Sequence, residues 1–238
     1  MLATRHTFVL VHGAWHGGWC WRRVADILVA RGHKVFTPTL TGLADRSHLM
    51  SASINLDTHI ADIVNLFEWE EVRDAQLVGH SYGGWPISGA IEKLESRVSS
   101  IVYLDAFLPE DSQRGLDFQT PENRAVIDAM MARGEFQRPK PKASSFNIVA
   151  PQDLAWVDAK MTTQPLGVAL QPIRMTGARD RVKKKAYIRT TVSNNTFFDG
   201  FAAKLKTRAG WRVYEETCGH DMMVDQPERL ADILVECA

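Results

Sequence analysis

The sequence has no excess charge of either sign and no long hydrophobic run. Its 238 residues include 28 lysines and arginines and 28 aspartates and glutamates, so the formal net charge is zero. A balanced charge removes the electrostatic argument for a nucleic-acid partner, because proteins that bind the phosphate backbone are usually basic. No apolar run approaches the ~20 residues of a membrane-spanning helix, so we expect no membrane partner either.

Cysteine is also scarce. Cys20, Cys218 and Cys237 are an odd number of thiols, and their spacing matches neither a metal site nor a redox pair. The first predicted strand begins at Thr7, which leaves no room for a secretory signal peptide. Reduced thiols without a leader predict a cytoplasmic protein.

What the sequence does contain is the apolar content of one large α/β domain. With 45% hydrophobic residues, the chain can bury a sizeable core. Short apolar runs alternate with segments of helical periodicity, and these runs lie at 7–11, 33–37, 76–78, 100–104, 185–192 and 211–215. Strands that alternate with helices predict a mostly parallel sheet flanked by helices, with ligands at the carboxyl ends of the strands.

The pentapeptide Gly-His-Ser-Tyr-Gly at 79–83 is the motif around which the chain is organised. An apolar run precedes it and a helical segment follows, which is the setting of a nucleophile elbow. The glycines on either side of Ser81 leave room for a strained turn that exposes the serine hydroxyl. His220, in the loop after the last predicted strand, is the expected general base. The amides of Tyr82 and of Ala14, which lies in a glycine-rich turn, are the expected oxyanion donors.

Two aspartates compete for the role of the acid that orients His220. Asp180 precedes the strand at 185–192, so it should lie at the amino end of that strand, away from the chemistry. The carboxyl end of the same strand carries Ser-Asn-Asn at 193–195, and none of these side chains can ionise. Asp105 ends the strand at 100–104, so we predict that Asp105 completes the triad, with a carboxylate that anchors the cap as the alternative. Asp199 is expected in the following helix as a solvated or capping residue.

Residues 107–176 interrupt the alternation of strands and helices. Seven of the ten prolines lie between 106 and 176. Two short helices are expected there, one from Thr120 to Gly134 and another around Val157. We therefore interpret 1–238 as a single domain, with a small helical cap inserted at 107–176 after the strand that follows the nucleophile.

Taken together, these motifs resemble the α/β-hydrolase superfamily over essentially the whole chain. The segments at 8–14, 17–19, 79–84 and 219–222 are similar to plant methyl esterases and hydroxynitrile lyases. Those at 38–42 and 103–109 are similar to bacterial esterases that cleave small esters and carbamates. The resemblance also supports Asp105, because haloalkane dehalogenases and some lipases of this fold place their acid at that strand end. Hydroxynitrile lyases of this branch carry threonine at the position of Gly13 and lysine directly after the histidine, where this chain has Asp221, so lyase activity is not expected.

The expected function is hydrolysis of a small, largely apolar carboxylic ester by a carboxylesterase-type serine hydrolase (EC 3.1.1 class), through an acyl-enzyme. This chemistry needs no metal and no organic cofactor, and a homodimer is left open. Lactone, carbamate, thioester or amide substrates would use the same groups, and a ligand receptor on the same fold is the alternative from another class. The side chains expected to contact substrate are Trp15, His12, Phe107, Trp156 and Met222.

Overall fold

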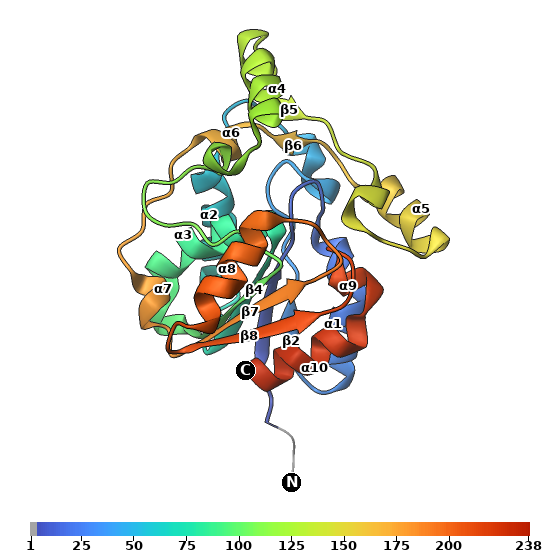
Figure 1. Ribbon diagram of the computed structural model, residues 1–238. Helices are drawn as coiled ribbons and strands as arrows, with labels where there is room; N and C mark the ends of the chain where they lie inside the picture. The colour runs from blue at the N-terminus through green and yellow to red at the C-terminus, as the bar shows by residue number, and fades with distance from the viewer. Residues whose placement is uncertain (1–3) are drawn as a thin grey trace.

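The computed structural model describes residues 4–238 and places a six-stranded sheet between two layers of helices (Figure 1). The strands are β1 (Thr7–Val11), β2 (Lys34–Phe36), β3 (Ala75–His80), β4 (Val98–Leu104), β7 (Lys184–Thr190) and β8 (Trp211–Glu216). Their order is β2-β1-β3-β4-β7-β8, and every neighbouring pair is parallel. The predicted parallel α/β sheet is confirmed.

Strand β1 explains why the apolar runs are continuous. Phe8 and Leu10 belong to the core on one face of the sheet, whereas Val9 and Val11 belong to the core on the other. All four side chains are fully buried. A strand covered on both faces cannot alternate polar with apolar residues.

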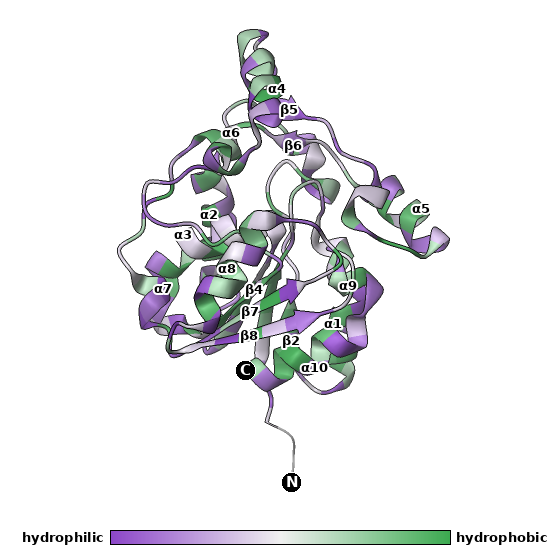
Figure 2. Ribbon diagram, viewed as in Figure 1, coloured by the Kyte–Doolittle hydropathy of each residue, from purple (hydrophilic) through white to green (hydrophobic). Residues whose placement is uncertain are grey.

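Two sets of helices cover the sheet. Helices α1 (Arg22–Ala30) and α10 (Pro227–Cys237) pack on one face, and α2 (Leu56–Trp69), α3 (Gly84–Leu94) and α8 (Thr196–Lys206) pack on the other. Figure 2 shows hydrophobic segments along α1 and α10 where they lie beside the strands. None of the helices in residues 4–238 combines the length and the hydrophobicity needed to cross a bilayer.

Most of the chain between β4 and β7 lies over the carboxyl ends of the strands, and its last part runs beside α3 to the amino end of β7 (Figure 1). It contains α4 (Pro121–Ala132), β5 (Gln137–Arg138), α5 (Pro151–Lys160), β6 (Gln164–Pro165), α6 (Gly167–Leu170) and α7 (Ala178–Arg181). Thr120 caps the first turn of α4 through a hydrogen bond from the Asn123 amide, and Gly134 follows that helix at φ +70°. The two helices expected in this segment are present.

The sequence did not predict β5 and β6, which pair as a short antiparallel ribbon. Strands of two residues have no periodicity to detect. The remaining helices are α9 (Met222–Asp225) and the 3₁₀ turns Gly18–Trp21, Ala44–Leu49, Ser81–Gly83, Glu95–Arg97, Gly115–Phe118 and Ala143–Phe146.

Candidate active site

Ser81 lies on a strained turn between β3 and α3. Its φ of +52° is in the left-handed region that non-glycine residues rarely occupy. A Cβ added at Gly79 would lie 2.7 Å from the carbonyl oxygen of Gly83, and one added at Gly83 would lie 2.8 Å from that of His12. The turn can therefore close only with glycine at both positions, as the motif predicted.

Asp105 contacts the candidate base directly. It is fully buried at the end of β4, and its Oδ2 accepts a hydrogen bond from His220 Nδ1 at 2.6 Å. Because Nδ1 carries this proton, Nε2 of His220 keeps the free lone pair that a general base needs. Burial opposes ionisation of Asp105, but the hydrogen bond from His220 and the Arg189 charge hold the pKa of the carboxyl below its usual value.

Other groups fix the Asp105 carboxylate from behind. Oδ1 accepts from Arg189 Nη1 at 2.8 Å and from the Thr190 amide at 3.1 Å. The Ser193 hydroxyl donates to Oδ2 at 3.2 Å. Arg189 and Ser193 are functional residues that sequence reasoning missed. The sequence placed Ser193 at the carboxyl end of β7, but no local pattern shows that these two side chains point toward Asp105.

Asp180 and Asp199 are placed elsewhere. Asp180 lies in α7, ahead of β7, and pairs with Arg208 at 2.9 Å on the surface. Asp199 lies in α8 as expected, and its mostly exposed carboxylate accepts from Arg189 Nε at 2.8 Å. Neither carboxylate bonds to His220, whereas Asp105 does.

The His220 ring is held between two aromatic rings. It stacks on Phe146 with a centroid distance of 5.8 Å and on Phe198 at 5.9 Å. Its backbone amide donates to the Phe146 carbonyl at 2.8 Å. His220 and Ser81 line the same pocket without a hydrogen bond between the two side chains, and such contacts often tighten only when substrate binds.

Ala14 and Tyr82, the predicted oxyanion donors, line this pocket beside Ser81. No acceptor within residues 4–238 takes a hydrogen bond from the Ala14 amide. The next residue, Trp15, has φ +64°, and its amide donates to Gln164 Oε1 at 2.9 Å. A second strained residue therefore shapes the turn that carries the Ala14 amide.

The pocket has a volume of about 390 Å³, and its surface is mostly apolar. Trp15 and Phe107 were predicted to contact substrate, and both line it. The other aromatic rings come from separate loops and helices: Trp85, Phe118, Phe146, Phe197 and Phe198. Besides Ser81, Tyr82 and His220, the polar side chains of the lining are Gln119, Thr120, Asn123, Arg138, Gln164, Asn194, Asn195 and Thr196. Among the described residues of the lining none is acidic, so the pocket offers no counter-charge to a cationic ligand.

Three predicted contact residues lie outside the pocket. His12 is buried, with Nδ1 donating to the Gly13 carbonyl and Nε2 accepting from the Leu40 amide, and burial lowers the pKa of its ring to about 3. Trp156 packs edge-on against Trp19 at 5.0 Å. Met222, the first residue of α9, is fully buried in the core. The prediction was wrong for all three because proximity in sequence to a catalytic group does not fix where a side chain points.

A buried ion pair joins the oxyanion turn to the His220 loop. Nδ1 of His16 donates to the Ala14 carbonyl at 2.8 Å, and Nε2 donates to Asp221 Oδ2 at 3.0 Å. With both ring nitrogens donating, His16 is an imidazolium. Burial of His16 opposes this charge, but the Asp221 carboxylate outweighs burial and raises the pKa of His16. Burial also opposes ionisation of Asp221, but the charge of His16 outweighs it and lowers the pKa of Asp221 to about 2.

His80 lies beside this pair. A Cβ added at Gly13 would lie 2.8 Å from His80 Nδ1, so the structure leaves no room for the threonine of hydroxynitrile lyases. His80, His220 and Asp221 also bring potential metal-ligand atoms within 4.8 Å of one another, a cluster that sequence spacing did not reveal. Hydrogen bonds account for it, since His80 Nε2 donates to the His220 carbonyl and Asp221 accepts from His16.

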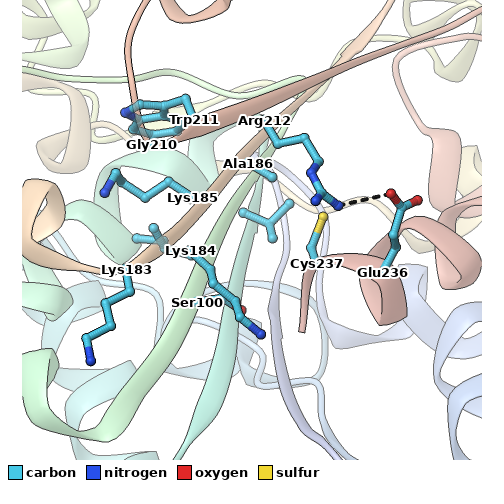
Figure 3. Close-up of a pocket in the computed structure, with 12 residues that line it drawn as sticks. Ser100, Lys183, Lys184, Lys185, Ala186, Gly210, Trp211, Arg212, Glu236 and Cys237 are labelled. Atoms are coloured by element: carbon cyan, nitrogen blue, oxygen red, sulfur yellow. Dashed lines mark hydrogen bonds and ion pairs between the residues drawn. The ribbon is translucent and has the colours of Figure 1, made fainter.

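Another cavity, of about 410 Å³, lies at the opposite end of the sheet (Figure 3). It is formed at the amino ends of β7 and β8, where Lys185 donates to the carbonyls of Asp180 and Val182, and Arg212 pairs with Glu236 at 2.9 Å. Because these charges are already bound, we assign the candidate active site to the aromatic pocket.

The parallel sheet, the strained serine and the aspartate–histidine pair define a hydrolase of the α/β class. The alpha/beta hydrolase family model matches residues 8–233, and the chain belongs to this family. The resemblance predicted from the motifs is thereby confirmed.

Two curated relatives are esterases. A carbendazim hydrolyzing esterase of Nocardioides sp. (strain SG-4G) is 38% identical over 237 residues, which cover 95% of this chain and 97% of the relative. Methylesterase 10 of Arabidopsis thaliana is 27% identical over 257 residues, which cover 98% and 92% of the two chains. The chain is thus close to plant methylesterases and to a bacterial carbendazim hydrolyzing esterase.

Solved structures confirm the fold. An extracellular α/β-hydrolase from a Paenibacillus species superposes with a TM-score of 0.86 at 21% identity, over 98% of this chain and 99% of the other. A pyrethroid hydrolase from Sphingobium faniae JZ-2 superposes with a TM-score of 0.71 at 21% identity, over 98% and 97% of the two chains.

Proposed function

We propose that the protein is a serine esterase that cleaves a small, uncharged and largely apolar ester through an acyl-enzyme. The observation that carries the proposal is the 2.6 Å hydrogen bond between buried Asp105 and His220, whose ring shares a pocket with strained Ser81.

In the first half-reaction, Ser81 Oγ attacks the ester carbonyl carbon and its proton passes to His220 Nε2. The carbonyl oxygen becomes an oxyanion that the Ala14 and Tyr82 amides stabilise, and one such donor typically contributes ~3 kcal/mol. Asp105 stabilises the imidazolium. His220 then gives the proton to the departing alcohol oxygen, which leaves Ser81 acylated.

In the second half-reaction, water takes the place of the alcohol. His220 removes a proton from water as the water oxygen attacks the acyl carbon, and it returns that proton to Ser81 as the acid leaves. No step requires a metal ion.

A carbamate is the second candidate substrate. The observation that favours it is the relative that hydrolyses carbendazim, which is 38% identical over almost all of both chains. A carbamate carbonyl would enter the same oxyanion site.

The test uses purified protein, 4-nitrophenyl butyrate and a fluorophosphonate probe. We expect turnover, loss of turnover after labelling, and a single adduct on Ser81 by mass spectrometry. Ser81→Ala should abolish labelling and turnover, and EDTA should change neither. An adduct on another residue, or full activity in Ser81→Ala, would refute the proposal.

A further inference from the structure

The ribbon of β5 and β6 presents hydrogen-bond donors to the active-site pocket. Gln164, on β6, is 1% exposed and lines the pocket. Its Oε1 accepts from the Trp15 amide at 2.9 Å, and because a backbone N–H can only donate, the oxygen must face that way. Gln164 Nε2 is then left buried, with no acceptor for its protons in the described chain.

Arg138 lies directly opposite Gln164 in the ribbon and also lines the pocket. Its guanidinium sits 5.5 Å from the centroid of the Trp15 ring, a cation–π contact. No carboxylate in residues 4–238 forms an ion pair with Arg138, and burial lowers the pKa of its guanidinium. In contrast, the more exposed Arg133, at the far end of α4, pairs with Glu135 at 2.7 Å.

Trp15 adds to the same wall. Its indole Nε1 is buried without an acceptor among the described residues. The wall therefore holds donors from three neighbouring side chains and no acidic group to receive them. A buried donor without an acceptor destabilises the folded chain, unless a ligand supplies the acceptor.

We propose that Gln164 and Arg138 form a subsite that selects esters with a second, uncharged acceptor, such as a ketone or amide carbonyl, away from the scissile bond. This inference rests on the proposed function and adds a substrate class to it. We infer an uncharged acceptor because Gln164 is neutral and aromatic side chains form much of the surrounding wall. A carboxylate bound there would lose more hydration free energy than the ion pair with Arg138 alone could replace. A pocket built to hydrogen-bond a substrate discriminates strongly against an analogue that lacks the partner group.

The test compares matched esters with and without the second carbonyl. One pair differs on the acyl side, 4-nitrophenyl pentanoate and 4-nitrophenyl 4-oxopentanoate. The other differs on the alcohol side, pentyl butanoate and 4-oxopentyl butanoate. Each kcat/KM is divided by the rate constant for alkaline hydrolysis, which removes differences in intrinsic reactivity. We expect the acceptor to raise the corrected kcat/KM at least about tenfold in one pair.

Two substitutions should remove this preference. Gln164→Glu keeps an oxygen for the Trp15 amide but replaces the Nε2 donor and places a carboxylate opposite Arg138. Arg138→Met keeps an aliphatic side chain on the Trp15 ring without the charge. In both variants the corrected ratio should fall to within about twofold of unity, whereas Arg133→Met should leave it unchanged.

The wild-type ratios test the inference even if a variant does not fold. Equal corrected rates in both pairs would overturn the subsite while leaving the esterase proposal intact, because the simple esters are still cleaved. Faster cleavage of 4-nitrophenyl hydrogen glutarate than of 4-nitrophenyl 4-oxopentanoate would overturn the inference that the acceptor is uncharged. Failure to cleave any of the esters would refute the proposed function instead.

Discussion

Replacement of Asp105 by asparagine tests the assignment of the triad acid most directly. Asparagine can keep an oxygen toward Arg189 and the Thr190 amide, which bond to Oδ1 at 2.8 and 3.1 Å. Its amide group would then face His220 in place of Oδ2, which is 2.6 Å from Nδ1. An amide N–H requires an acceptor there, so the ring proton moves to Nε2, and the lone pair that should accept the Ser81 proton is lost.

The expected loss in kcat is about 10⁴-fold, or ~5.5 kcal/mol of transition-state stabilisation, because the tautomer is wrong. Stability should fall as well. Removing one partner of a buried ion pair typically costs about 3–5 kcal/mol. We expect the lower end of this range because Arg189 still has a second carboxylate partner, with its Nε donating to Asp199 Oδ1 at 2.8 Å.

The two effects separate if kcat is measured at a temperature where circular dichroism shows the variant to be folded. Asp180→Asn is the matched control, since it removes a surface carboxylate paired with Arg208. This control should retain wild-type kcat. A folded Asp105→Asn protein with kcat within tenfold of wild type, or an equal loss in Asp180→Asn, would refute the reasoning.

Three further predictions concern charge, acid stability and packing. Because the surface of the pocket is mostly apolar and Arg138 is the one cationic side chain among its described lining residues, a neutral ester should have a higher kcat/KM than a dicarboxylate ester, and a substrate panel that ranks them in reverse would contradict this. Asp221, whose pKa is lowered to about 2, should contribute about 2 kcal/mol of stability above its unfolded pKa, and this is lost as pH falls from 5 toward 2. Urea unfolding of Asp221→Asn should therefore show a smaller loss of stability between pH 5 and pH 2 than the wild-type protein shows. The raised pKa of His16 does not affect this range, because its contribution to stability is lost only as pH rises. Gly84→Ala should destabilise the protein by more than ~2 kcal/mol, because its Cβ would lie 2.0 Å from the Phe107 carbonyl oxygen, whereas Gly200→Ala, with nothing nearby, should be neutral or stabilising in thermal melts.

The sequence predicted those parts of the fold that depend on local signals. Buried strands, helix ends and the glycines around Ser81 each have a chemical signature within a few residues. The position of Asp105 followed from topology alone, because parallel strands bring their carboxyl ends to one edge of the sheet. The predicted contact between Asp105 and His220 is present at 2.6 Å.

What the sequence could not predict was the direction of side chains in loops. His12 and Met222 are each close in sequence to a functional group, yet both point into the interior. Arg189 contacts Asp105 because β7 pairs with β4 in a particular register, which no local pattern specifies. The same holds for Gln164, which reaches Trp15 from 149 residues away.

Placing the acid on β4 has a consequence for how substrate range can diverge. The loop after β7 carries no ionisable catalytic group, yet Asn194 lines the pocket, and Phe197 follows at the start of α8. Substitutions at these two positions can reshape the wall while Asp105 and His220 stay on other segments. Selection or library design could therefore explore new substrates through this loop without rebuilding the proton-transfer pair.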